Sequence, residues 1–132
     1  MFNLIVKYRP WADGRGTIPR SRTFEYTESN LVNRFDVQGQ LNFDSLTKFP
    51  TLFVQETTGA GDQVARVGTI IRARLGGNDI ALEYVYDLGM PSIPNHVLQT
   101  FAAELDVDVF EFSRTHWAVK NADLFRTLWR LS

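Results

Sequence analysis

The strongest constraint on the fold of this chain is a pair of β-rich segments joined by a short turn. Residues 64–75 and 80–86 are rich in Val, Ile, Leu and Tyr, and the residues between them are Gly76, Gly77, Asn78 and Asp79. Glycine and asparagine adopt the positive φ angles that tight hairpin turns need. The pattern therefore predicts an antiparallel β-hairpin over residues 64–86.

A register with Leu75 opposite Ile80 gives this hairpin an apolar face. Side chains alternate between the two faces of a strand, so every second pair lies on the same side. The expected pairs on that face are Ala73 with Leu82, Ile71 with Tyr84 and Thr69 with Tyr86. The other face would pair Arg72 with Glu83, whereas a shift by one residue would set Arg72 against an apolar side chain.

Shorter patterns predict the remaining strands. Apolar or alternating runs favour strands over residues 2–8, 22–26 and 51–55. The segment 9–22 contains two prolines and two glycines, so we expect a loop there. Trp117 and Val119 alternate as in a further strand.

Two helices are expected in the second half of the chain. The first begins at residue 94 or 95 and runs to about residue 105, with apolar residues at helical spacing. The second has Asn121 as its N-cap, and its apolar side would hold Leu124, Phe125, Leu128 and Trp129. Before them, Ser29 could cap a single helical turn that runs to Phe35, and Asp44 could cap a short turn that ends before Pro50.

Strands followed by helices indicate an α+β fold with an antiparallel sheet. Two arrangements fit this order: a small sheet covered by the two helices of the C-terminal half, or a sheet that curls into a partly closed β-barrel. The chain has 132 residues, with no internal repeat and no linker of distinct composition. We therefore expect residues 1–132 to form a single domain.

Composition excludes several kinds of chemistry. The chain has no cysteine, which rules out thiolate catalysis, cysteine-ligated zinc and disulfide bonds. The first apolar run is too short for a signal peptide, and no segment has the roughly 20 apolar residues that a membrane span requires. We therefore expect a cytoplasmic protein with no membrane interaction, no cofactor and no bound metal.

Arginines and a tryptophan are concentrated near the start of the chain, and the candidate binding residues among them are Arg9, Trp11 and Arg15. Arginine binds phosphates and other anions, and a tryptophan face can stack on a base. The formal net charge of −1 argues against nucleic acid as the ligand. An alternative is that this basic segment pairs with the acidic residues of segment 104–111.

A second candidate site is the segment that carries Arg114, His116 and Lys120. Imidazole titrates near neutral pH, and the two cations beside it could hold an anion. A partly buried histidine packed beside Trp117 is the structural alternative, which we favour. Metal ligation by His116 with the acids Glu104, Asp106 and Asp108 is left open, although these acids are also typical of a solvated face, which we favour.

The Gly-rich segment 57–62 is predicted to be a plain turn. It lacks the Lys-Ser/Thr ending of a phosphate-binding loop, and it precedes a strand, whereas dinucleotide-binding fingerprints open a helix.

The run His116-Trp117-Ala118-Val119-Lys120 and the later Asp123-Leu124-Phe125 are the most specific part of a resemblance that covers residues 46–128. This part of the chain resembles an uncharacterised bacterial module at the front of larger proteins, some of which carry effector domains of anti-phage or stress systems. The resemblance implies a recognition or regulatory module more than an enzyme. It supplies no catalytic residues.

These observations favour a non-enzymatic bacterial recognition module that binds a protein partner or a small anionic ligand. The binding residues would be Arg9, Trp11 and Arg15, or Arg114, His116 and Lys120, or both sets. One alternative is an enzyme of phosphoester or nucleotide chemistry, with His116 as acid or base and Arg114 or Lys120 stabilising developing charge. Another is a structural or oligomerising domain, and the sequence does not specify the oligomeric state.

Overall fold

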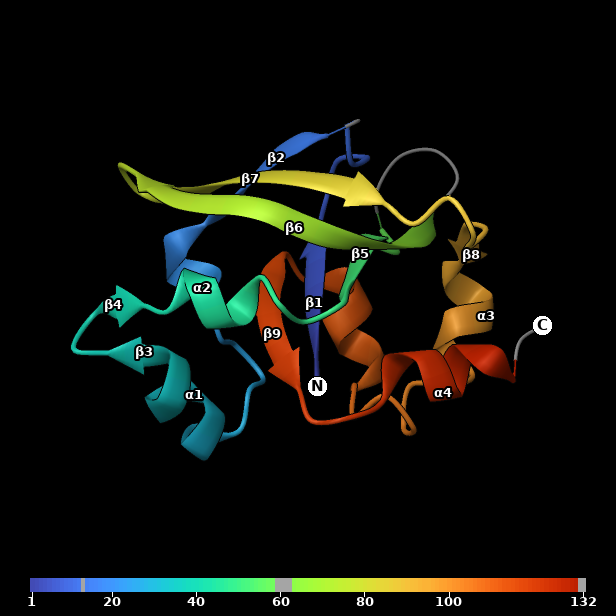
Figure 1. Cartoon of the computed structure of the whole chain (residues 1–132). Coiled ribbons are helices and arrows are strands. Elements are labelled where there is room, and N and C mark those ends of the chain that lie inside the picture. Colours follow the sequence, from blue (N-terminus) through green and yellow to red (C-terminus); the bar gives the residue numbers. More distant parts are fainter. Residues whose placement is uncertain (13, 59–62, 131–132) are drawn as a thin grey trace.

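The computed structural model describes residues 1–12, 14–58 and 63–130. Its main element is a seven-stranded sheet with the order β2-β7-β6-β5-β1-β9, and the short β8 pairs with β6 (Figure 1). The strands of this sheet are β1 Phe2–Lys7, β2 Arg15–Pro19, β5 Thr51–Gln55, β6 Val64–Gly76, β7 Asp79–Tyr86, β8 Ile93–Pro94 and β9 His116–Lys120. A separate small ribbon consists of β3 Asp36–Val37 and β4 Gln40–Leu41.

Short helices lie on both sides of the sheet. They are α1 Ser29–Phe35, α2 Phe43–Leu46, α3 Asn95–Gln99 and α4 Leu124–Trp129, with 3-10 turns η1 Arg20–Arg22 and η2 Val109–Ser113. In Figure 1, α1 and α2 lie to the left of the central strand β1, and α3 and α4 lie to its right. No helix in the described ranges is long and apolar enough to cross a bilayer.

The predicted α+β fold is confirmed, and the sheet does not close into a barrel. The sheet is antiparallel at every pairing except that of β1 with β5, which is parallel. A parallel pair needs a crossover connection, and the chain between β1 and β5 supplies it by forming β2, α1, the β3–β4 ribbon and α2.

Two hydrophobic cores form because strand side chains alternate between the faces of the sheet. On β1, Phe2, Leu4 and Val6 pack on the face that α3, η2 and α4 cover. Ile5 of β1 packs on the opposite face, which α1 and α2 cover. All four of these side chains are fully buried.

The hairpin of β6 and β7 is confirmed, and its register matches the prediction from the turn as far as the pair Arg72 with Glu83. Beyond that point a β-bulge shifts the pairing, so that Tyr84 faces Ile70 instead of Ile71. Ile70 and Ala73 belong to the same core, although a regular strand cannot place residues three positions apart on one face. The extra residue of the bulge resolves this conflict and leaves Ile71 61% exposed.

The strand predicted over residues 22–26 is wrong. This segment leaves η1 and crosses the outer edge of β9, where Phe24 N donates to Trp117 O at 2.6 Å and Val119 N donates to the Thr27 hydroxyl at 3.0 Å. Phe24 and Tyr26 have positive φ angles of 66° and 56°. The segment therefore covers the edge of the sheet without forming a ladder of its own.

The segment 9–22 contains strand β2, where a loop was predicted. The sequence Arg-Gly-Thr-Ile-Pro is a poor strand former by itself, since Gly and Pro both disfavour strand interiors. Pairing with β7 provides the missing stability, because Ile18 lies opposite Ile80 and both side chains are fully buried. A partner distant in sequence thus determines this strand.

Helix positions were predicted better than helix caps. The N-cap of α4 is Asp123, which accepts from Arg126 N at 3.1 Å, and the predicted Asn121 lies outside the helix. Asn42 caps α2 where Asp44 was predicted, and α1 has no side-chain cap. Helix α3 ends at Gln99, and turns continue the chain towards residue 105.

Candidate functional site

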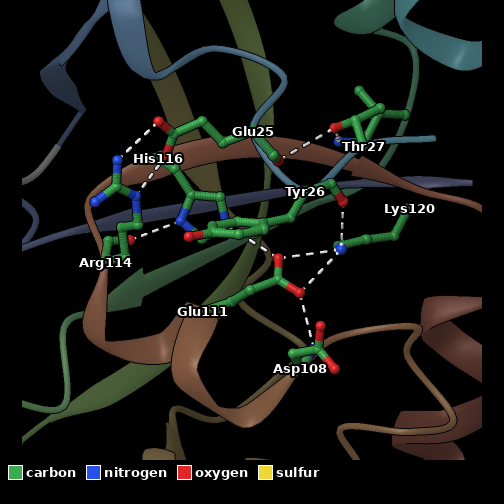
Figure 2. A network of polar contacts seen from close by, with 9 residues as sticks. Glu25, Tyr26, Thr27, Asp108, Glu111, Arg114, His116 and Lys120 are labelled. Carbon is green, nitrogen blue, oxygen red and sulfur yellow. Dashed lines mark hydrogen bonds and ion pairs between the residues drawn. The ribbon is translucent and has the colours of Figure 1, made fainter. Parts of the chain in front are cut away.

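A buried charge cluster lies where η2 meets β9, and it consists of Glu111, His116 and Lys120 (Figure 2). His116 Nε2 is 3.1 Å from Glu111 Oε1, and Lys120 Nζ is 3.0 Å from the same carboxylate. At most 4% of any of these three side chains is exposed. Such a group is stable in the interior only if each polar atom has a partner.

Two local structures bring the cluster together. His116 and Lys120 are four residues apart on β9, so both side chains point to the same face of the strand. Glu111 belongs to a capping box in η2, and its Oε2 accepts from Asp108 N at 2.8 Å. This second bond fixes the carboxylate towards β9.

Backbone carbonyls complete the hydrogen bonding of the two basic side chains. Lys120 Nζ donates to Tyr26 O at 2.7 Å, and His116 Nδ1 lies 2.6 Å from Arg114 O. Both ring nitrogens of His116 therefore lie within hydrogen-bond distance of oxygen atoms of the protein.

The pKa of the Glu111 carboxyl reflects opposing effects. Burial raises this pKa, but the hydrogen bond from His116, the amide N–H of Asp108 and the charge of Lys120 together bring it below its usual value. The carboxylate is thus held in its ionised form by its neighbours.

Arg114 is the most exposed of the predicted residues in this segment. Its guanidinium binds Glu25 in a bidentate manner, with N–O distances of 2.7 and 2.9 Å. The hydrogen bond from Arg114 lowers the pKa of Glu25. The ring of Tyr26 closes the cluster from outside by packing edge-on against His116, with centroids 5.2 Å apart.

The structure therefore brings His116 and Lys120 together on Glu111, while the Arg114 guanidinium binds Glu25 (Figure 2). His116 has no exposed surface. This placement favours the structural interpretation of His116 over ligand binding or acid–base catalysis, which both need contact with a second molecule. Within the described ranges, no group of three or more histidine and carboxylate side chains is arranged to hold a metal ion.

Trp11 is also engaged within the protein. Its ring packs edge-on against Phe53 and Tyr84, at centroid distances of 5.2 and 5.5 Å, and its Nε1 donates to Val54 O at 3.0 Å. Lys7 Nζ lies 4.9 Å above the ring. These contacts make Trp11 the anchor of the segment between β1 and β2, while Arg9 beyond it is exposed.

Arg15 belongs to a different surface, which sequence reasoning did not find. A groove of about 330 Å³ runs over β2, β7 and β6. We call it the basic groove, and its principal residues are Lys7, Arg15, Thr17, Arg72, Arg74 and Glu83. The arginines come from strands distant in sequence, and the prediction of a loop over 9–22 gave no reason to place Arg15 beside the hairpin.

Strand pairing fixes the order of charges in the basic groove. Arg15 lies opposite Glu83 on β7, and Glu83 lies opposite Arg72 on β6, so the three residues form one row across the sheet. In the described part of the chain, none of the four cationic residues of the groove forms an ion pair. Partial burial and the nearby Arg9 lower the pKa of Lys7. Positive charge in this groove is therefore only partly compensated.

Comparisons with models of known protein families, with curated proteins and with solved structures find no match to this chain. The resemblance to a bacterial module therefore stays a prediction, and functional inference depends on the geometry of the chain itself.

Proposed function

We propose that this chain is a non-enzymatic recognition module that binds an anionic partner in the basic groove. The observation that supports this most is the set of cationic side chains around the groove, Lys7, Arg15, Arg72 and Arg74, with Glu83 as the one acidic residue among the described residues that line it. The three arginines are exposed, and none has an ion-pair partner among the described residues. An anion in the groove would meet several of these charges at once.

Charge in a groove acts more strongly than the same charge on a convex surface, because low-dielectric walls concentrate the field. The whole chain carries a formal net charge of −1, so attraction for anions is local to the groove and not general. Of the residues predicted to bind, Arg15 fits this proposal directly. Arg9 lies close enough to the groove for its charge to lower the pKa of Lys7.

A binding or catalytic role for Arg114, His116 and Lys120 stays a prediction that has less support. The contacts that these side chains make with Glu25, Glu111 and backbone carbonyls would first have to break. The oligomerising alternative and the bacterial assignment also stay predictions.

The proposal is tested by fluorescence anisotropy with a labelled polyglutamate peptide. We expect binding that weakens as salt is raised towards about 150 mM, where the Debye length is about 8 Å. Arg72→Glu should weaken binding about tenfold, because it converts an attraction at the groove into a repulsion. Arg126→Glu is the matched control, since it makes the same charge change on the exposed side of α4. Equal loss in both variants, or no binding by the unmodified protein, would contradict the proposal.

A further inference from the structure

We infer that the partner in the basic groove is an acidic segment of a protein chain that also presents an apolar side chain. This inference rests on the proposed function and adds the chemical class of the partner. Three features of the outer face of β2, β7 and β6 support it: exposed aliphatic side chains, the position of Glu83, and the absence of a stacking ring among the described groove residues.

The exposed aliphatic side chains are Ile71 and Val85. Ile71 is 61% exposed and Val85 is 52% exposed, on neighbouring strands of the hairpin. The bulge between Ile70 and Arg72 turns Ile70 into the core, and Ile71 is left outside next to Arg72. An apolar group of a partner would therefore find aliphatic surface directly beside the cations of the groove.

The position of Glu83 favours separated negative charges in the partner. Neighbouring strands lie about 4.8 Å apart, so the backbones of Arg15 and Arg72 are about 10 Å apart with Glu83 between them. A continuous phosphate backbone would bring negative charge against this carboxylate. Carboxylates spaced along a peptide can reach the two arginines without placing a negative charge against Glu83.

The described residues that line the groove include no aromatic side chain. Proteins that bind single-stranded nucleic acid usually stack bases on exposed rings, each of which contributes strongly to affinity. Trp11 adjoins the groove through Lys7 and Gly16, but Phe53 and Tyr84 pack against its ring. The surface therefore fits an acidic and apolar peptide better than it fits a nucleic acid.

The experiment compares three labelled probes of equal charge on the full chain: a peptide that alternates glutamate with leucine, polyglutamate and oligothymidine. We expect the glutamate–leucine peptide to bind about tenfold more tightly than polyglutamate, a gain of the size that partial burial of one leucine provides. Oligothymidine should bind more weakly than either peptide.

Variants of the aliphatic residues test the same point. Ile71→Ser and Val85→Thr should each bring the affinity of the glutamate–leucine peptide close to that of polyglutamate and leave polyglutamate binding unchanged. Leu88→Ser is the control, because Leu88 is 94% exposed and lies after the end of β7, outside the strands that form the groove. Circular dichroism would verify that each variant is folded.

The outcomes separate this inference from the proposed function. One outcome would overturn the inference about the partner and leave the groove as an anion-binding site. In that outcome the unmodified protein binds oligothymidine as tightly as the glutamate–leucine peptide, and Arg72→Glu abolishes binding of all probes. The same holds if both folded aliphatic variants bind the glutamate–leucine peptide as well as the unmodified protein does. If no probe binds, the proposed function itself fails.

Discussion

The imidazole of His116 and the carboxylate of Glu111 lie 3.1 Å apart, and no more than 1% of either side chain is exposed. Lys120 binds the same carboxylate from β9, so one acidic group serves two basic partners inside the protein. The cluster connects η2, β9 and the segment that ends at Tyr26.

Glu111→Gln should destabilise the fold strongly. The substitution keeps the size of the side chain but leaves Lys120 buried without a counter-ion, and removing one partner of a buried pair costs about 3–5 kcal/mol. Urea unfolding at neutral pH measures this loss. Glu104→Gln is the matched control, because Glu104 pairs with Arg130 at the surface and its loss should cost less than about 1 kcal/mol. Similar losses for both variants would show that the cluster is not a source of stability.

The stability of the fold should decrease in acid. The pKa of Glu111 and that of Glu25 are lower in the folded protein than in the unfolded chain, where a glutamate titrates near about 4.3. Both carboxylates therefore contribute stability that is fully present above that pH and is lost as the pH falls through the folded pKa. Unfolding free energies measured between neutral and acidic pH should fall accordingly. In Glu111→Gln the decrease should be smaller, and an equal decrease would contradict this assignment.

Trp11→Ala should reduce stability by about 2–3 kcal/mol, somewhat below the usual cost for a fully buried ring because Trp11 is only partly buried. The substitution removes the indole ring, and with it the contacts with Phe53 and Tyr84 and the hydrogen bond to Val54 O. Thermal unfolding gives the change. Tyr8→Ala is the control, because Tyr8 is 53% exposed. An unchanged midpoint for Trp11→Ala would show that the ring is available for a ligand.

Arg114→Ala should leave anion binding in the basic groove unchanged. Arg114 is paired with Glu25 at the edge of β9, and it does not line the groove. The anisotropy titration with polyglutamate checks this. A loss as large as that of Arg72→Glu would move the binding site to the segment first singled out from the sequence.

The hairpin was predictable because its signals are local. The turn residues and the alternation near them determine the pairs from Leu75 with Ile80 to Arg72 with Glu83. The bulge was not predictable from alternation alone, since it depends on which of Ile70 and Ile71 fits the core. Strand β2 was missed for a related reason, because it forms through pairing with β7.

The candidate sites show the same difference between local signals, which the sequence reveals, and long-range pairing, which it does not. Residues close in sequence, such as His116 and Lys120, were recognised together, but Glu111 was not singled out as their partner. The spacing of Asp108 and Glu111 is that of a capping box, and this signal would have indicated an ordered turn before β9. The basic groove had no such signal, because only the folded sheet places Arg15, Glu83 and Arg72 in one row.

The most direct test of the central proposal is to map polyglutamate binding on the amide resonances of the isotopically labelled protein. The proposal predicts that the largest shifts occur on β2 and on the β6–β7 hairpin, at Arg15, Thr17, Arg72 and Arg74. Amides of β9, from His116 to Lys120, should shift little, because every residue of this strand is buried. Shifts concentrated on β9, or spread evenly over the surface, would contradict a binding site in the basic groove.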